Sequence, residues 1–218
     1  LPGLGTRFAL PPKPALRTRY ELGLPEGRLA VVPQSIFKVL PDNDPIYARL
    51  LDGDGTLRLA FFGADLTADA ARFRARLSRA VGAAAAKRLH FLPELSRTRF
   101  LETIASCDLM IDTLGWSGGN SALDALRAGL PIVTCAGEFM RGRQCATMLR
   151  LLGIEGAQAD SPEELAELDA LIVSDPTMIL ADEPTGNLDR VDRGLNDLVD
   201  HPDCDRALMT HIENALGA

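Results

Sequence analysis

The sequence predicts an α/β fold in which helices cover both faces of a doubly wound parallel sheet. Short apolar runs typical of buried strands alternate with longer segments in which apolar residues recur at helical spacing. The intervals between the runs are long enough for the helical crossovers that parallel strands require. With 218 residues, 46% of them hydrophobic, the chain is large enough for one large domain or for one and a half.

The predicted strands and helices follow one another in turn as far as residue 152. The strands are expected at residues 29–32, 57–62, 89–92, 109–111 and 132–134. The helices are expected at residues 44–51, 67–81, 96–104, 121–128 and 142–152. The predicted N-caps are Asp44, Ser96 and either Asn120 or Ser121. Residues 1–28, rich in Pro, Gly and Arg, are expected to form a linker and a loop ahead of the first strand.

The charge of the chain changes sign near residue 150. Residues 1–150 hold 20 Lys and Arg against 14 Asp and Glu, whereas residues 151–218 hold 3 against 16. The first part is therefore suited to an anionic ligand and the second is not. Because the basic residues are dispersed and only 5% of the residues are aromatic, no nucleic-acid partner is predicted.

Several other classes of function are also disfavoured. No apolar run approaches the roughly 20 residues of a membrane span, so no membrane partner is expected. The four cysteines, Cys107, Cys135, Cys145 and Cys204, show no C-x-x-C spacing and are interpreted as free thiols of a cytoplasmic protein. Neither the cysteines nor the three histidines have the spacing of metal ligands, so no metal site is predicted.

A glycine-rich loop between a strand and a helix is the first indication of a binding site. Gly115, Gly118 and Gly119 follow the strand at 109–111, and glycines let a backbone turn tightly and approach a ligand closely. The free amides at the start of the next helix, with its dipole behind them, favour an anion such as phosphate. A tight turn that binds nothing fits the same local pattern equally well.

A longer stretch around this loop resembles a known family. WSGGNSALDALRAGLPIVT, followed by GEFMRGRQCATMLRLLG, is similar to the nucleotide-sugar site of the O-linked N-acetylglucosamine transferases, in particular the bacterial members fused to tetratricopeptide repeats. The resemblance extends from about Gly3 to about Gly156. It implies the Rossmann-like C-terminal lobe of a two-lobed GT-B glycosyltransferase. We expect residues 1–156 to form this nucleotide-sugar-binding lobe and residues 157–218 to form an acidic segment of uncertain structure.

The resemblance also implies an activity. The donor would be a UDP-sugar, with UDP-N-acetylglucosamine as the implied compound, and the acceptors would be Ser and Thr hydroxyls of proteins. No cofactor or metal ion would be needed. Because Leu1-Pro2-Gly3 is not a natural beginning, the chain is interpreted as a fragment. The N-terminal lobe and the repeats that select acceptors would lie outside it, so the fragment is expected to bind the donor without catalysing transfer.

Two loops carry the next predicted site residues. Lys38 ends a Q-x-x-x-K element that begins at Gln34, and the resemblance makes it the catalytic cation that neutralises the leaving diphosphate. A solvated surface lysine is the alternative. The backbone near Pro93 and Leu95 would hold the uracil base. Arg97 stands where many members carry a histidine; it can pair with a phosphate, or it is an exposed residue of the first helical turn.

The glycine-rich loop carries the remaining site residues. Asn120 and Ser121 replace a Thr-Thr pair of the family, so the resemblance implies that they contact the β-phosphate together with Gly118 and Gly119; capping the helix is an alternative or additional role. The resemblance makes Asp124 the carboxylate that binds the ribose hydroxyls, although a favourable charge near a helix start explains it too. Two further residues each have two possible roles. Arg143 is either a salt-bridge anchor or a second phosphate ligand, and Trp116 stacks on a sugar or base or packs within its own domain.

The acidic segment contains a second, conflicting resemblance. DPTMILADEPTGNLD, residues 175–189, resembles the Walker B and D-loop element of an ABC transporter ATPase, in which Asp182 would organise Mg²⁺ and Glu183 would polarise water. The chain has no G-x-x-x-x-G-K-[ST] phosphate loop, so ATP hydrolysis is not expected. A fragment of such an ATPase and a non-catalytic module that binds a nucleotide or a partner remain the alternatives to the glycosyltransferase lobe.

Overall fold

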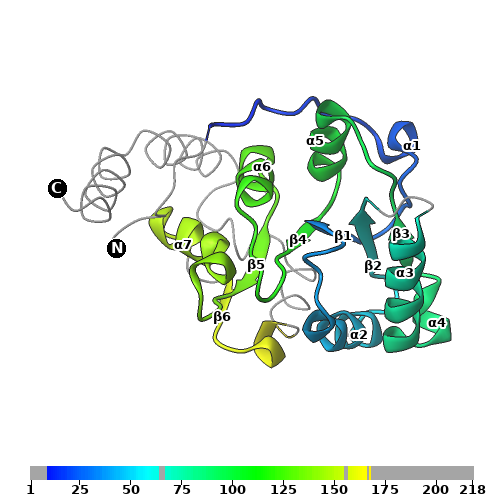
Figure 1. Cartoon of the computed structure of the whole chain (residues 1–218). Helices are drawn as coiled ribbons and strands as arrows, with labels where there is room; N and C mark the ends of the chain where they lie inside the picture. The colour runs from blue at the N-terminus through cyan, green and yellow to red at the C-terminus, as the bar shows by residue number, and fades with distance from the viewer. Residues whose placement is uncertain (1–8, 64–66, 155–156, 166, 168–218) are drawn as a thin grey trace.

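The computed structural model describes residues 9–63, 67–154, 157–165 and 167; the Walker B-like segment 175–189 lies outside them. Six parallel strands form one sheet in the order β3-β2-β1-β4-β5-β6. The strands are β1 (Leu29–Ser35), β2 (Arg58–Phe62), β3 (Leu89–Phe91), β4 (Leu109–Ile111), β5 (Ile132–Cys135) and β6 (Gln158–Ala159). This order is that of a Rossmann fold, which confirms the predicted fold class (Figure 1).

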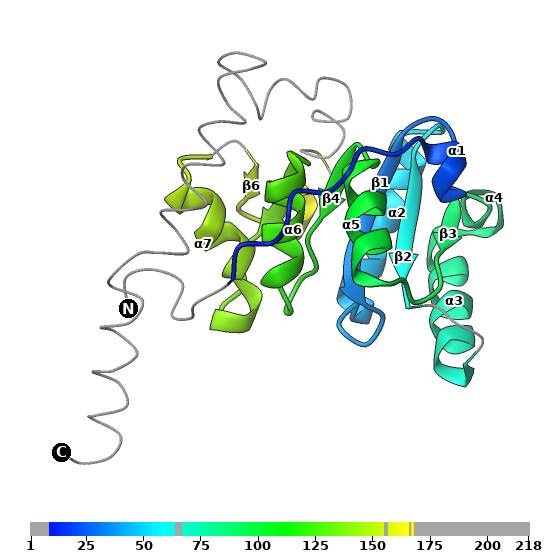
Figure 2. The same cartoon turned by 90° about the horizontal axis from the view of Figure 1, so that it is seen from above.

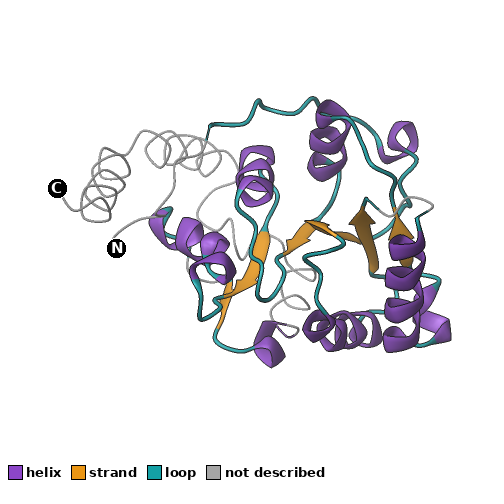
Figure 3. Ribbon diagram, in the orientation of Figure 1, coloured by secondary structure: helices purple, strands orange, loops and turns teal. Residues whose placement is uncertain are grey.

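Helices cover both faces of the sheet (Figures 2 and 3). The described α-helices are α1 (Arg19–Leu22), α2 (Asp44–Gly53), α3 (Ala68–Val81), α4 (Ala83–Ala86), α5 (Arg97–Ala105), α6 (Asn120–Ala128) and α7 (Gln144–Leu151). Two short 3₁₀ helices, Pro41–Asn43 and Met140–Gly142, precede α2 and α7. Among the helices of the described ranges, none is long and apolar enough to cross a membrane.

Each face of the sheet has its own apolar core. Along β1, Ala30 and Val32 pack on the side of α2 and α3, whereas Leu29 and Val31 pack on the side of α5, α6 and α7. Successive side chains of a strand point to opposite faces, so a strand buried on both faces is a continuous apolar run. That is why short apolar runs, rather than alternating patterns, identified the strands in the sequence.

The end of β1 departs from a regular strand. The register of β1 against β2 shifts between Val32 and Ser35, around Pro33, which has no N–H to donate to the ladder. Strand β1 extends to Ser35, beyond its predicted end at residue 32. A shift of this kind re-aims the side chains that follow it. Gln34, which is buried here, reaches the first turn of α6.

Two of the predicted helix caps differ in the structure. Ser96 caps α5 as predicted, because its hydroxyl accepts from the Arg99 amide. The Asp44 prediction is wrong: Asp44 is the first residue of α2 and forms an ion pair with Arg76 at 3.0 Å. Neither Asn120 nor Ser121 caps α6, whose N-cap is Gly119 without any side-chain hydrogen bond. Asp44 pairs with Arg76 of α3, and the Ser121 hydroxyl accepts from Gln34 of β1; sequence spacing does not reveal such partners.

Three elements lie outside the predicted pattern. Helix α1 falls within the predicted linker, and the short helix α4 follows α3. Strand β6 pairs with β5 beyond residue 156, so the sheet continues past the predicted end of the lobe. Residues 162–165 are helical. These pieces are too short for periodicity to identify them.

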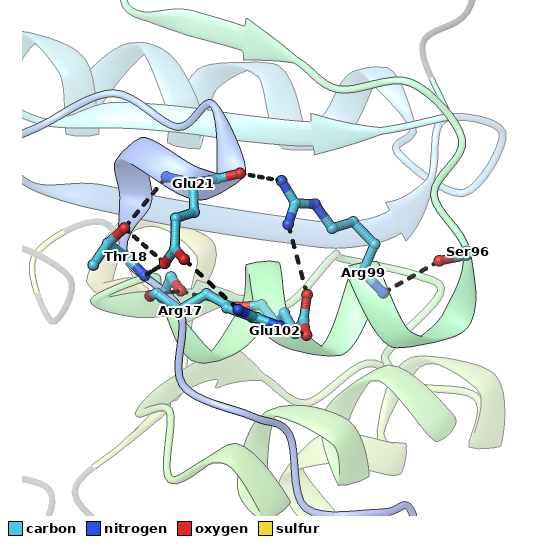
Figure 4. Close-up of polar contacts among 7 residues, drawn as sticks. Arg17, Thr18, Glu21, Ser96, Arg99 and Glu102 are labelled. Carbon is cyan, nitrogen blue, oxygen red and sulfur yellow. Dashed lines mark hydrogen bonds and ion pairs between the residues drawn. The ribbon is translucent and has the colours of Figure 1, made fainter.

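A polar network ties α1 to α5 (Figure 4). The Thr18 and Glu21 side chains form a capping box at the start of α1. Arg17 lies 3.5 Å from Glu102 of α5, and Arg99 lies 3.7 Å from the same carboxylate while also donating to the Glu21 carbonyl. The segment ahead of the first strand is thereby held against the helix that begins at Arg97.

Candidate functional site

The candidate site lies at the carboxyl ends of β1 and β4, which are neighbours in the sheet. From β1 the chain proceeds to β2 and β3 on one side and returns to β4 on the other, so the strand order reverses here. Ligands of doubly wound sheets bind at this point. The predicted segments that follow the two strands, residues 34–38 and 112–121, both belong to it.

A hydrogen bond joins the end of β1 to the start of α6. The Gln34 amide nitrogen donates to the Ser121 hydroxyl at 3.0 Å. Gly118 lies directly against this pair: a Cβ there would be 2.9 Å from the Gln34 nitrogen and from the Ser121 oxygen, and 3.2 Å from the Ala122 nitrogen. Only glycine fits without displacing these atoms, so close packing, and not a positive φ, requires Gly118.

Asp112 organises the glycine-rich loop, and the sequence analysis missed it. Its carboxylate is buried and accepts from the Gly118 amide at 2.7 Å, the Ser117 hydroxyl at 2.6 Å and the Thr134 hydroxyl at 2.8 Å. Burial raises the pKa of Asp112, and these hydrogen bonds oppose the shift. Its position could have identified Asp112 in the sequence, because a carboxylate directly after a wholly apolar strand must find buried donors.

Ser117 extends this network to the next loop. Its hydroxyl accepts from the Cys145 amide at 2.9 Å, near the start of α7, and its own amide donates to the Arg141 carbonyl at 2.7 Å. The loop after β4 and the loop after β5 are therefore connected through one buried side chain. A displacement of Ser117 would move both loops.

The first turn of α6 offers backbone amides to an anion. Gly119 is the N-cap without a side-chain bond, and the Asn120 side chain is exposed. The first amides of a helix have no partner within the helix and carry the positive end of its dipole. The Gly118 amide is different, because it already donates to Asp112. Gly118 therefore shapes the loop, while the amides that follow it are the donors suited to an anion.

Arg97 and Asp124, which were predicted separately, form a bidentate ion pair. Arg97 Nη1 donates to Asp124 Oδ2 at 2.5 Å, and Nη2 donates to Oδ1. The Asp124 side chain is 2% exposed and the Arg97 side chain 53%. The hydrogen bond to Asp124 raises the pKa of the guanidinium. Arg97 is therefore more than an exposed residue of a helical turn.

The ion pair competes with the predicted ribose contact. Leaving a buried charge without its partner costs about 3–5 kcal/mol, whereas a hydrogen bond to a charged group contributes about 1.5–3 kcal/mol net. The pair uses one acceptor site on each carboxylate oxygen, so a ribose diol binds Asp124 either through the remaining sites with Arg97 in place or by displacing Arg97. Ribose hydroxyls are neutral, so displacement of Arg97 would carry a net cost.

The other predicted residues of the first two loops are accessible. Lys38 is exposed, and no carboxylate of the described residues pairs with its ammonium group. Its amide donates to the Ser35 carbonyl at 2.8 Å, which closes a turn after β1. Pro93 is exposed, while Leu95 packs partly against the core under α5 and α6.

Arg143 and Trp116 make contacts within the loops. The Arg143 Nε donates to the Gly137 carbonyl at 3.0 Å, and no ion pair of Arg143 occurs among the described residues, so the salt-bridge interpretation finds no support there. Trp116 is 41% exposed. The Arg141 guanidinium lies 5.2 Å from its ring and 4.9 Å from that of Phe139. Trp116 thus contacts its own domain and still presents a surface.

The cysteines and acidic residues show no metal centre within the described ranges. Cys107, Cys135 and Cys145 are free thiols, as predicted, and Cys204 lies outside the described residues. Burial raises the pKa of Cys107 to about 12. No group of three or more His, Cys, Asp or Glu side chains in the described part could hold a metal ion.

Solved structures similar to this chain include GT-B glycosyltransferases. A lysine-to-methionine mutant of the Thermobaculum terrenum O-GlcNAc transferase is 22% identical over 87% of this chain and 35% of its own, with a TM-score of 0.69. Sucrose-phosphate synthase from Thermosynechococcus elongatus is 16% identical over 91% of this chain and 48% of its own, with a TM-score of 0.61. Anabaena HepE, in complex with UDP-glucose, is 14% identical over 90% of this chain and 51% of its own, with a TM-score of 0.58.

These similarities concern the fold of one part of each enzyme. The chain spans between about a third and a half of the lengths of these three proteins. No protein family in a family scan and no curated protein matches the sequence significantly. The chain therefore shares the Rossmann-like fold found in GT-B glycosyltransferases, including an O-GlcNAc transferase.

Proposed function

We propose that this chain is the donor-binding lobe of a glycosyltransferase that uses a UDP-sugar. The observation that carries the proposal is the uncapped start of α6 at the point where the strand order reverses, in a fold that glycosyltransferases share. A helix N-terminus in this position is suited to a diphosphate. The complex of Anabaena HepE with UDP-glucose supports a nucleotide-sugar as the ligand class.

In the proposed site, the diphosphate is bound by the amides that follow Gly118 and by the side chains of Asn120 and Ser121. Lys38, exposed in the turn after β1, provides the catalytic cation. When an acceptor hydroxyl attacks the sugar carbon and the bond to UDP breaks, negative charge accumulates on the leaving phosphate. A nearby ammonium group and helix amides stabilise that charge more than they stabilise the ground state.

The finer assignment follows the sequence resemblance. The sugar would be N-acetylglucosamine, the acceptors Ser and Thr hydroxyls of proteins, and the backbone near Pro93 and Leu95 would hold the base. Acceptors would be selected by an N-terminal lobe and tetratricopeptide repeats, and this lobe would not catalyse transfer by itself. In this proposal the enzyme acts in the cytoplasm.

A non-catalytic nucleotide-binding module is the second candidate. The ion pair between Arg97 and Asp124 favours it, because this pair occupies the carboxylate that the resemblance assigns to ribose. Both candidates bind UDP, and they differ in sugar transfer. Transfer from UDP-N-acetylglucosamine by the complete protein, containing both lobes, would separate them.

Calorimetric titration tests the binding function. We expect UDP to bind the wild-type chain with a micromolar Kd and Mg-ATP not to bind. Lys38→Ala should weaken UDP binding at least tenfold, because it removes the exposed cation. Lys87→Ala, at another exposed lysine after α4, is the matched control and should change Kd less than twofold. Failure of the folded wild-type chain to bind UDP would refute the proposal.

A further inference from the structure

Exposed apolar side chains lie on two neighbouring loops, one between β4 and α6 and one between β5 and α7 (Figure 1). The first loop contributes Trp116, and the second contributes Phe139, Met140 and the exposed Arg141. Phe139 is 58% exposed and Met140 is 62% exposed. Large apolar side chains gathered at the surface are typical of a face that another molecule covers.

The guanidinium of Arg141 contacts two aromatic rings. Its carbon lies over the rings of Trp116 and Phe139. Among the residues that the structure describes, none accepts a hydrogen bond from this guanidinium and no carboxylate pairs with it. Its five N–H donors are thus without an acceptor in this part of the chain. A guanidinium held over aromatic rings is suited to a planar carboxylate, which it can bind through two N–H groups.

Backbone contacts fix the position of these side chains. The Gly137 amide donates to the Gly142 carbonyl at 2.7 Å, and the Gly142 amide donates to the Phe139 carbonyl at 2.8 Å. A Cβ at Gly137 would lie 3.0 Å from the Gly142 carbonyl oxygen, so the two ends of this loop are in close backbone contact. The Arg141 carbonyl accepts from the Ser117 amide at 2.7 Å, which joins the two loops. A preorganised loop loses little conformational entropy when a partner binds.

The composition of these loops favours a polypeptide partner. Trp, Phe, Met and Arg are the residue types enriched in protein–protein interfaces and, for Trp and Arg, among the residues that dominate binding energy. A polypeptide can place one carboxylate against Arg141 and an apolar side chain against Met140. A nucleic acid is disfavoured, because its closely spaced phosphates would meet the exposed carboxylate of Glu138 in the same loop.

We propose that Trp116, Phe139, Met140 and Arg141 form a docking surface for a polypeptide segment that carries an Asp or Glu side chain beside an apolar one. The charge of the unpaired guanidinium requires the acid, and the exposed rings and thioether require the apolar neighbour. This inference goes beyond the proposed function, because it assigns a protein partner to residues that have no role in the proposed donor site. It does not depend on UDP binding.

Selection of displayed random dodecapeptides on the wild-type chain tests this surface. We expect the enriched peptides to share an Asp or Glu adjacent to an aliphatic or aromatic residue. A synthetic copy of the most enriched peptide should shift the emission of Trp116, the only tryptophan of the chain, to shorter wavelength as its ring leaves water. Replacement of the acid in that peptide by its amide should weaken binding at least tenfold.

Variants of the chain identify the contact, with Trp116 emission as the readout. Arg141→Gln should weaken peptide binding at least tenfold, and Arg141→Lys, which keeps the charge but loses the fork, should give an intermediate Kd. Both should fold, because residue 141 contacts the neighbouring loop through its backbone carbonyl. Met140→Ser, which changes no charge, should weaken binding at least threefold. Arg150→Gln, at an exposed arginine in the last turn of α7, is the matched control and should leave Kd within twofold.

The results distinguish this inference from the proposed function. Arg141→Gln should leave the Kd for UDP within twofold of wild type; a tenfold loss would place Arg141 in the donor site and overturn the inference. If the wild-type chain binds the peptide but not UDP, only the proposed function is overturned. The inference also fails if no peptide is enriched or if peptide binding survives Arg141→Gln unchanged. Binding of oligouridylate in place of peptides, or self-association of the chain, would overturn it if either depended on Arg141, because the occupant would then be a nucleic acid or a second copy.

Discussion

At the scale of single residues, Asp112 is the side chain on which the loop after β4 depends. It accepts from Ser117, Gly118 and Thr134, and each buried donor left without an acceptor costs about 1–3 kcal/mol. The Arg97–Asp124 pair shows the same principle for charges, because a carboxylate that is 2% exposed needs its cation. Neither arrangement depends on a neighbour in sequence.

Substitution of Asp112 should reveal its titration. Burial raises the pKa of Asp112 in the folded state. Between the unfolded pKa, about 4, and this raised pKa, the folded chain therefore binds more protons than the unfolded chain. The free energy of unfolding falls as pH rises through this range. Asp112→Asn removes that titration, so wild type should lose stability relative to the variant as pH increases. Urea unfolding between pH 4 and pH 8 measures the difference; an increase in the relative stability of wild type would contradict the raised pKa.

At the scale of elements, the site is formed where β1, the glycine-rich loop and α6 meet. The shifted end of β1 brings Gln34 to Ser121, and Gly118 fits against both. The chain segments involved are separated by more than eighty residues, and the hydrogen bond between Gln34 and Ser121 joins them. Ser117 then links this junction to α7 through the Cys145 amide.

Gly118→Ala tests this junction. The added methyl group would lie 2.9 Å from the Gln34 and Ser121 side chains, so we expect their hydrogen bond to break and stability to fall by about 1–3 kcal/mol. Gly53→Ala is the control, since a Cβ at the end of α2 meets no atom within 4 Å. It should be neutral or stabilising by up to about 1 kcal/mol. Thermal denaturation compares the two variants, and equal stabilities would disprove the close packing.

At the scale of the whole molecule, the positive charge of residues 1–150 accompanies the proposed anion site. These residues carry 20 basic and 14 acidic side chains, and the site cations Lys38 and Arg97 are both accessible to solvent. Exposed charges are screened by salt, with a Debye length of about 10 Å at 0.1 M and about 3 Å at 1 M. We expect UDP affinity to fall several-fold between these salt concentrations while the affinity for neutral uridine stays constant. A UDP affinity independent of salt would contradict an electrostatic site.

The sequence alone determined the alternation of strands β1 to β5 with the longer helices, and with it the fold class and the edge of the sheet at which the candidate site lies. These features follow from local patterns: buried strands are apolar runs, helices have an apolar face, and Ser96 caps the helix that follows it. The resemblance to a glycosyltransferase site indicated a fold that the structure confirms.

Only the tertiary structure decided which side chains partner one another. The sequence predicts a ribose contact for Asp124 and a phosphate contact or an exposed position for Arg97, and the structure adds an ion pair between the two. It predicts a cap at Asp44, which instead pairs with Arg76. Asp112 was overlooked because its donors come from a loop and from a different strand. Local patterns reflect neighbours along the chain, whereas the partner of a buried polar group depends on which elements the fold brings together.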